Sequence, residues 1–440
     1  MNNNKNSVIV IGAGLAGSEC AYQLLKRGVD VTLYEMKPKK FSPAHKSENF
    51  AELVCSNSLK SNDFYTAGGL LKQELRTLDS LVIKCADECK VPAGSALAVD
   101  REKFSNLVTK KLKEFKNLTI VNDEVLSIPL DKPVVIATGP LTSDGLMKEL
   151  SKLLGADYLY FFDAIAPIVA YDSIDFNSAF VADRYDKGTG DYINCPMDKD
   201  EYEVFYNALV NAEIVKLKDF ENRKVFEGCM PVEVLAKRNI DSLRFGPLKP
   251  VGLIDPHTGK RPYAVVQLRK ETINNDMFNM VGFQTNLTYP EQKRVFSLIP
   301  ALKNTEFLRY GTMHKNSYVC APVTLSNYHL KKYPNIFIAG QLSGVEGYIE
   351  SIASGLNVAL NMYNYLNGLQ DVVFEPCTMI GALNRYLSTA SEKNFQPMSS
   401  NMGLINLNQL RIKDKKEKNK VLYDLAMQSL HNTIEKYNLN

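Results

Sequence analysis

The feature that most constrains the fold is a glycine-rich turn between an apolar strand and a helix near the N-terminus. Val8–Ile11 is an apolar run of four residues, and the next six, Gly12–Gly17, read GAGLAG and match the pattern GxGxxG. Residues 18–27 have helical character, and residues 29–34 alternate as a second strand that leads to Glu35. Together these segments predict the βαβ unit that binds dinucleotides in Rossmann-type folds.

The three glycines and the acid have separate roles in such a unit. Gly12 permits the tight turn, Gly14 lets the backbone approach a pyrophosphate, and Gly17 lets the helix pack closely on the strand. The N-terminus of the helix presents free N–H groups and the positive end of its dipole to the phosphates. Glu35 can accept a hydrogen bond from a ribose hydroxyl and disfavours a 2′-phosphate, so we expect FAD or NAD rather than NADP at this site.

Two later segments favour FAD over NAD. Residues 134–138 read as a buried strand that runs into Gly139, and residues 336–339 read as another strand. The second of these strands is followed by glycines at 340, 344 and 347 and by a helix to about residue 360. Flavoprotein folds use such a late turn to bring a second helix N-terminus to the flavin, although an ordinary strand–helix turn is the alternative. We therefore predict an α/β chain with a Rossmann-like FAD-binding domain of the glutathione-reductase type.

Because both ends of the chain contribute to this fold, its middle reads as an insertion. The length of 440 residues exceeds what a single core needs. We predict a discontinuous FAD-binding domain over residues 1–165 and 326–440. We predict an inserted mixed α/β domain, which would hold the substrate, over residues 166–325.

Within and after the insertion the pattern predicts individual elements. Residues 198–211 read as a helix, and residues 265–268 and 280–283 read as strands. Residues 187–190 and 255–260 are rich in turn formers. The tail carries a run of charges over residues 411–420, which indicates the solvated start of a docking helix, with an RNA-facing patch as the alternative.

Composition excludes several classes of protein. The eight cysteines include no CxxC pair, and the five histidines have no ligand spacing, so neither a metal site nor a thioredoxin-type centre is expected. Apolar runs reach about half of the roughly 20 residues that a membrane span needs, and no secretory segment is seen, so we expect a cytoplasmic protein. The net charge of +3 neither indicates nor excludes nucleic acid, because a local basic face would suffice.

Two cysteines lie in contexts that favour reactivity. Cys55 is followed by Ser56–Ser58, residues that can cap a helix, and a thiol near a helix N-terminus ionises readily. Cys229 lies between Gly228 and Pro231, in a turn that could expose a thiol. By spacing alone either residue fits a small buried position better, and spacing does not show whether the two meet.

Long stretches across nearly the whole chain match one family. The chain resembles the folate- and FAD-dependent uridine-5-methyltransferases of bacterial RNA, relatives of the glucose-inhibited-division family. It departs from that family at residues 45–48, which read HKSE where HHTD is usual, at Tyr289, where tryptophan is usual, and at residues 355–361. The matching stretches are GAGLAGSECAYQL (12–24), NFAELVCSNS (49–58), GSALAVDRE (94–102), YFFDAIAPIV (160–169), DYINCPMDKDEYE (191–203), FEGCMPVEVLA (226–236), LRFGPLKPVGL (243–253), RPYAVVQLR (261–269) and GQLSGVEGYIESIASG (340–355).

The resemblance implies a reaction and a site. Methylenetetrahydrofolate would give a one-carbon unit to C5 of a uridine, reduced FAD would carry or reduce that carbon, and NAD(P)H would recharge the flavin. The usual target is uridine-54 in the T-loop of tRNA, and a uridine of 23S ribosomal RNA is the alternative. Cys229 matches the thiolate that adds to uracil C6, and Cys55 matches the cysteine beside the flavin, where it acts as a base or a transient one-carbon partner. The positions expected to contact the cofactor are Gly12, Ala13, Gly14, Leu15, Ala16, Gly17, Glu35, Gly139, Gly340, Gln341, Gly344, Gly347 and Tyr348.

Two other classes of function stay open on the sequence. One is an NAD(P)H-dependent flavin oxidoreductase that acts on small molecules, and the other is a non-catalytic flavoprotein that binds RNA. An RNA substrate needs cationic side chains for its phosphates. The candidates are Arg238, Arg244, Lys249, Arg261 and Arg269.

Overall fold

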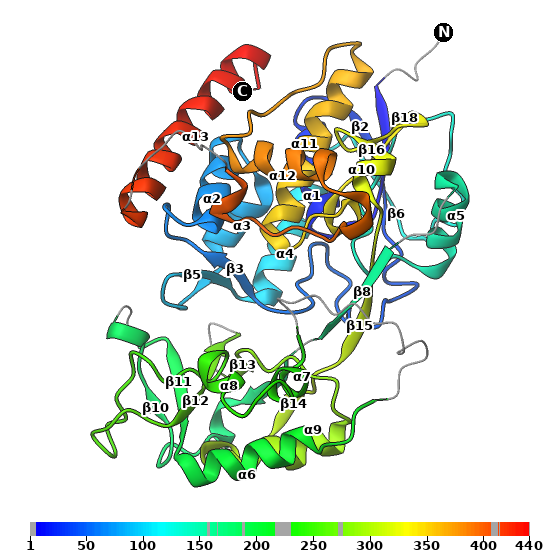
Figure 1. Cartoon of the computed structure of the whole chain (residues 1–440). Coiled ribbons are helices and arrows are strands. Elements are labelled where there is room, and N and C mark those ends of the chain that lie inside the picture. The colour runs from blue at the N-terminus through cyan, green and yellow to red at the C-terminus, as the bar shows by residue number, and fades with distance from the viewer. Residues whose placement is uncertain are drawn as a thin grey trace.

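The protein has two lobes, the upper and the lower one in Figure 1, here called the first and the second lobe. A mainly parallel sheet forms the core of the first lobe, and an antiparallel sheet forms the core of the second. The first lobe contains both ends of the described chain, and the second lobe is built from its middle. The computed structural model describes residues 6–155, 159–164, 166–186, 190–215, 230–271, 276–405, 412 and 414–439.

A seven-stranded sheet organises the first lobe. Its strands are β1 (Ser7–Ile11), β2 (Asp30–Tyr34), β6 (Leu118–Val121), β7 (Val134–Ile136), β16 (Leu325–Ser326), β17 (His329–Leu330) and β18 (Tyr333–Ile338). They lie in the order β16-β17-β18-β7-β1-β2-β6, and the pairs from β18 to β6 are parallel. Every residue of β7 is buried, as expected for an inner strand of a parallel sheet covered on both faces.

The predicted βαβ unit and the late strand–turn–helix are both present. Because parallel strands end at the same edge of a sheet, the turns after β1, β7 and β18 meet there. The helices of this lobe are α1 (Leu15–Leu25), α2 (Ala67–Thr77), α3 (Leu81–Glu88), α4 (Arg101–Lys113), α5 (Asp144–Leu154), α10 (Ala321–Thr324), α11 (Tyr348–Leu366), α12 (Met379–Thr389) and α13 (Lys415–Tyr437).

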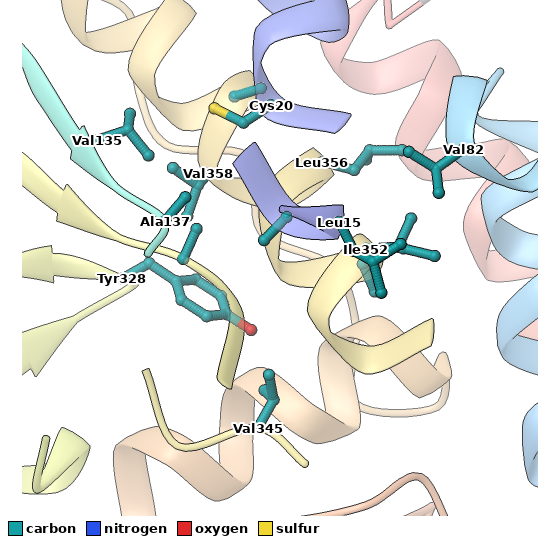
Figure 2. Packing of buried hydrophobic residues seen from close by; sticks show 14 of the residues in the cluster. Leu15, Cys20, Val82, Val135, Ala137, Tyr328, Val345, Ile352, Leu356 and Val358 are labelled. Carbon is teal, nitrogen blue, oxygen red and sulfur yellow. The ribbon is translucent and has the colours of Figure 1, made fainter. Parts of the chain in front are cut away.

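Helices α1 and α11 pack directly on each other beside the sheet. A Cβ atom on Gly355 would lie only 2.3 Å from the carbonyl oxygen of Ala16, so the two helix backbones touch at this glycine. Figure 2 shows the apolar side chains around this crossing, among them Leu15 of α1 and Ile352 and Leu356 of α11. The crossing fixes the N-termini of both helices relative to the sheet edge.

A smaller antiparallel sheet also belongs to the first lobe. Its strands are β3 (Ser58–Ser61), β4 (Lys90–Val91) and β5 (Ala96–Val99), in the order β3-β5-β4. Strand β3 follows directly after Cys55–Asn57, so the helix that the sequence predicts after Cys55 is wrong. A helix that begins directly after Cys55 therefore does not account for any reactivity of this thiol.

The second lobe is a six-stranded antiparallel sheet with four α-helices among its described residues. The strand order is β10-β11-β12-β13-β9-β14. The strands are β9 (Ile168–Ala170), β10 (Phe180–Val181), β11 (Tyr192–Met197), β12 (Ala264–Lys270), β13 (Met277–Met280) and β14 (Phe307–Arg309). The helices are α6 (Lys199–Val210), α7 (Val232–Ala236), α8 (Ser242–Phe245) and α9 (Tyr289–Phe296).

The sequence patterns of this lobe are mostly confirmed. The predicted helix is α6, which begins with a capping box in which Asp198 and Glu201 each accept the other's backbone N–H. The strand predicted at 265–268 lies inside β12, but the strand predicted at 280–283 is wrong, because β13 ends at Met280 and Gly282 adopts a φ of 77°. Residues 255–260 do form a turn, closed by a bridge between Asp255 and Lys260.

A two-stranded ribbon links the lobes. Its strands, β8 (Leu159–Ala164) and β15 (Met313–Tyr318), are antiparallel and run between the two lobes in Figure 1. The domain boundaries at residues 165/166 and 325/326 stay a prediction, and we propose that the ribbon is where the chain crosses. Among the described helices, none has the length and apolar character that a bilayer span requires.

Candidate active site

A large pocket opens at the sheet edge where the three glycine turns meet. Its empty volume, which includes space open to solvent, is about 1700 Å³. The predicted cofactor residues in its wall are Gly12, Gly14, Leu15, Ala16, Glu35, Gly139, Gly340, Gln341, Gly347 and Tyr348, and Cys55 lies there as well. A pocket that extends along all three glycine turns suits an extended dinucleotide such as FAD.

The first turn has the steric properties that a pyrophosphate site needs. A Cβ on Gly17 would lie 1.8 Å from the Gly12 carbonyl oxygen, so this glycine lets helix α1 pack against the turn. A Cβ on Gly14 would meet no atom of the protein within 4 Å. Gly14 therefore leaves open space in front of the backbone at the N-terminus of α1, which is where a phosphate is expected to approach.

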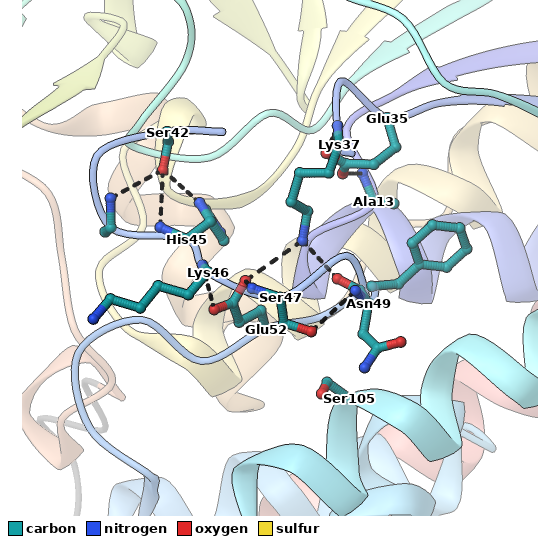
Figure 3. Close-up of polar contacts among 12 residues, drawn as sticks. Ala13, Glu35, Lys37, Ser42, His45, Lys46, Ser47, Asn49, Glu52 and Ser105 are labelled. Carbon is teal, nitrogen blue, oxygen red and sulfur yellow. Dashed lines mark hydrogen bonds and ion pairs between the residues drawn. The ribbon is translucent and has the colours of Figure 1, made fainter. Parts of the chain in front are cut away.

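Glu35 is held in place at the end of β2 (Figure 3). Its carboxylate accepts hydrogen bonds from the backbone N–H of Ala13 at 3.0 Å and from that of Lys37 at 3.1 Å. The side chain is buried and lies in the pocket wall. These contacts aim the carboxylate along the first turn, and its hydrogen bond to a ribose hydroxyl stays a prediction.

The loop after Glu35 forms another part of the wall. The Lys37 ammonium is buried, donates to the Asn49 carbonyl at 2.6 Å and lies 3.6 Å from the Glu52 carboxylate. Glu52 in turn accepts the backbone N–H groups of Lys46 and Ser47 (Figure 3). Glu52 therefore fixes the HKSE segment in which the sequence departs from its family.

Three predicted cofactor positions lie behind the pocket wall rather than in it. Ala13 is buried and contacts Glu35 through its N–H, and Gly17 packs on Gly12. A Cβ on Gly344 would lie 2.5 Å from the ring of Phe395, so Gly344 serves packing. These residues shape the site without lining it, and direct contact with a cofactor stays a prediction for them.

Cys55 lies in the pocket wall next to the first turn of helix α11. The Tyr348 hydroxyl accepts hydrogen bonds from the backbone N–H of Cys55 at 2.8 Å and of Ser56 at 3.1 Å. Burial raises the pKa of Tyr348, so the phenol stays protonated at neutral pH. Tyr348 thereby joins the Cys55 segment to the first turn of α11.

Three arginines hold the five residues from Leu53 to Asn57 by backbone and side-chain contacts. Arg101 donates to the carbonyl oxygens of Leu53 at 2.7 Å and Cys55 at 2.9 Å. Arg309 donates to the Val54 carbonyl at 2.8 Å. Arg269 donates to the Ser56 hydroxyl at 2.7 Å and to Asn57 Oδ1 at 3.1 Å. Since Arg269 and Arg309 lie on strands of the second lobe, the Cys55 segment is part of the contact between the lobes.

Sequence reasoning missed this arginine cluster. Arg101 falls within the matched stretch at 94–102, but nothing in its spacing relates it to Cys55. Glu271 forms an ion pair with Arg101, and burial, which would lower the pKa of Arg101, is outweighed by this carboxylate. Arg269 was predicted to contact RNA phosphate; it is buried against Ser56 and Asn57, so that prediction is wrong.

The other residues predicted to contact phosphate differ in their exposure and in their neighbours. Arg244 is paired with Asp241 at 2.6 Å and lies 3.6 Å above the Tyr263 ring. Arg238, Lys249 and Arg261 are exposed on the second lobe. Exposure leaves these three able to meet a phosphate, which stays a prediction.

Cys229, the other predicted catalytic residue, lies outside the described residues. Residues 187–189 of the predicted turn and residues 411 and 413 of the charged tail also lie outside them. The nearest described segment after Cys229 begins at Met230, and Val232 donates its N–H to the Gln284 carbonyl at 2.7 Å in the second lobe. Among the described residues, no group of three or more His, Cys, Asp or Glu side chains is arranged to hold a metal ion.

The fold and pocket define a dinucleotide-binding protein of the flavoprotein type with an inserted second lobe. A family model described as "Glucose inhibited division protein A" matches residues 7–370, and the chain belongs to this family. The solved structure of GidA from Aquifex aeolicus has the same fold, with a TM-score of 0.68 at 17% identity over 98% of this chain and 75% of that one. The predicted fold class is thus confirmed.

Curated relatives narrow the family further. A protein of Acetivibrio thermocellus named "Methylenetetrahydrofolate--tRNA-(uracil-5-)-methyltransferase TrmFO" is 58% identical over 96% of both chains. The protein of the same name from Bacillus subtilis is 52% identical over 98% of this chain and 99% of its own. The chain therefore belongs with these methyltransferases inside the larger family, and the predicted resemblance is confirmed.

Proposed function

We propose that this protein is an FAD-dependent enzyme that uses methylenetetrahydrofolate to methylate C5 of a uridine in tRNA, with NAD(P)H as the reductant. The observation that carries the proposal is the near full-length identity of 58% to a relative named for this activity. The pocket agrees with it, because a dinucleotide site and the predicted Cys55 share one wall. Since the substrate is tRNA, we propose that the enzyme works in the cytoplasm.

The residues present fit FAD. Gly14 leaves the space that a pyrophosphate needs, and the Glu35 carboxylate is directed at the position of a ribose. The turn from Gly340 to Gly347 and the first turn of α11 would face the flavin end. When bound, FAD supplies the reducing equivalents that complete the methyl group.

The two cysteines would have different roles toward uracil, Cys229 as the nucleophile and Cys55 as the base. C5 of uracil is a poor nucleophile, and addition of the Cys229 thiolate at C6 makes it able to attack an electrophilic methylene. The C5 proton must then be removed by a base, and Cys55 is the candidate in the pocket wall. A uridine in folded RNA has to leave its stack to reach such a site.

The uridine target in tRNA is expected at position 54 of the T-loop, and a uridine of 23S ribosomal RNA is the alternative. Incubation of the purified yellow protein with methylenetetrahydrofolate, NADPH and unmodified transcripts of either RNA tests both, with the methylated base mapped by nuclease digestion and mass spectrometry. We expect 5-methyluridine in the tRNA transcript. Product only in the ribosomal transcript would reassign the substrate, and product only with S-adenosylmethionine would refute the donor.

The second cysteine has its own test. RNA with 5-fluorouridine at the target position should trap a covalent adduct with the wild-type protein and none with Cys229→Ala. Cys377→Ala is a matched control, because Cys377 lies outside the pocket wall. An undiminished adduct with Cys229→Ala would place the nucleophile on another residue. The alternative functions, a flavin oxidoreductase or a non-catalytic RNA-binding flavoprotein, would then have to be tested.

A further inference from the structure

We propose that Arg309, on the second lobe, is a positioning residue whose positive charge keeps Cys55, on the first lobe, in its thiolate form. The proposal rests on the proposed function only for the place of Cys55 in catalysis. The reactivity of the thiol can be measured without RNA or folate, so the two can fail separately.

The first step of the argument is position. Arg309 is the last residue of β14, and its guanidinium reaches across to the Val54 carbonyl, 255 residues earlier in the chain, at 2.8 Å. This contact sets the guanidinium beside the residue that precedes Cys55. Cys55 lines the dinucleotide pocket and is only partly exposed. A charge so placed acts on the thiol through protein rather than through bulk water, where it would be strongly screened.

The second step is the balance of charge around the thiol. The charged or titratable groups of the described residues that interact with this segment are Arg101 from α4, Arg269 from β12, Glu271 after β12, Arg309 from β14 and Tyr348 from α11. Glu271 is paired with Arg101, and Tyr348 stays neutral because burial raises its pKa. Three guanidinium groups and one carboxylate leave two positive charges in excess.

The third step is that Arg309 carries a part of this excess that acts on the thiol. Within the part of the chain that the structure describes, Arg309 forms no ion pair with a carboxylate. Burial lowers its pKa and the neighbouring Arg101 lowers it further, whereas the Cys55 thiolate is the largest factor that raises it. The attraction is mutual, so Arg309 favours the charged form of Cys55 as much as the thiolate favours protonated Arg309.

In this proposal the Arg309 guanidinium has the role that the sequence suggested for a helix N-terminus after Cys55. The segment after Cys55 is strand β3, which offers no helix dipole. The positive charge of Arg309 comes from a side chain of the other lobe, so this contribution requires contact between the two lobes.

The test measures alkylation of Cys55 by iodoacetamide in the FAD-loaded protein over a range of pH, with the modified peptide identified by mass spectrometry. Arg309→Met removes the charge and should slow alkylation at neutral pH by about tenfold, because the loss of a neighbouring opposite charge shifts a pKa by about one unit or more. The pH of half-maximal rate should rise accordingly. Arg309→Lys keeps the charge and should stay within about threefold of wild type. Methyl transfer to tRNA should fall in kcat for Arg309→Met with little change in KM.

The control is Arg294→Met, which removes an exposed arginine of α9 in the same lobe and should leave the profile unchanged. A wild-type profile in Arg309→Met that retains FAD and melts normally would overturn the proposal. If Arg309→Met does not retain FAD, Arg309→Lys decides: alkylation near the wild-type rate supports the role of charge, and a tenfold loss overturns it. The expected alkylation shift with no fall in the kcat of methyl transfer would count against the proposed role of Cys55 in catalysis alone.

Discussion

Substitution of Gly14 and Gly17 by alanine should affect different properties of the protein. Gly14 leaves space for the cofactor, whereas Gly17 lets helix α1 pack on the turn. The two residues lie three positions apart in the same turn. A Cβ at Gly14 would meet nothing within 4 Å, and the backbone there, with φ −71° and ψ −165°, is open to any residue. A Cβ at Gly17 would lie 1.8 Å from the Gly12 carbonyl oxygen and 3.3 Å from the Ala137 side chain.

The expected free energies follow from these distances. At Gly14, alanine gains about 0.4–1 kcal/mol by restricting the unfolded chain and loses a similar amount as a poorer N-cap, so the apoprotein should keep its stability within about 1 kcal/mol. At Gly17, the backbone of the turn has to move by more than about 1 Å, and such overpacking costs about 3 kcal/mol or more. A gain of about 1 kcal/mol in helix propensity offsets part of this, which leaves a net loss of about 2 kcal/mol.

FAD binding should show the opposite contrast. In Gly14→Ala the new methyl group fills the space that a pyrophosphate would use, and we expect FAD affinity to fall at least about tenfold, or about 1.4 kcal/mol. Thermal melting of the two apoproteins and titration with FAD, followed by flavin fluorescence, measure both quantities. If Gly14→Ala bound FAD as tightly as wild type, the pyrophosphate would not lie at this turn. If the Gly14→Ala apoprotein melted at as low a temperature as the Gly17→Ala apoprotein, a Cβ at residue 14 would have to clash with the protein, which contradicts the open space in front of Gly14.

Three further predictions concern residues around the site. Glu35→Gln keeps one acceptor oxygen for the N–H groups of Ala13 and Lys37 but turns an amide donor toward the other, so FAD affinity should fall about tenfold by titration, while the exposed Glu48→Gln has no effect. Gly355→Ala drives a methyl group against the Ala16 carbonyl and should lower the apoprotein melting temperature, by a loss of about 1–3 kcal/mol; unchanged melting would contradict the close crossing of α1 and α11. Burial lowers the pKa of Lys72 from 10.5 to about 7, so the unfolded chain binds more protons between these values and stability should rise with pH across that window. Urea unfolding of Lys72→Met should lack this part of the rise, and an identical slope in both proteins would contradict it.

The nucleotide-binding half could be read from the sequence because its signals are local. The apolar run at Val8–Ile11, the GxGxxG turn and Glu35 lie within one βαβ unit, and each is required by hydrogen bonding and steric contact among residues close in the chain. The same holds for the turn after β18 and for helix α6 with its capping box. Long stretches of matching sequence added the chemistry, which the pattern of elements alone does not specify.

Only the tertiary structure decided what surrounds Cys55. Local sequence suggested a helix N-terminus, but the structure places a strand there and supplies guanidinium groups from α4, β12 and β14. The same folding turned Arg269 from an expected surface cation into a buried support of Ser56 and Asn57. The physical reason is that the electrostatics of a side chain depend on charges within a few ångströms in space, and residues 54 and 309 become neighbours only when the ribbon β8–β15 brings the second lobe against the first.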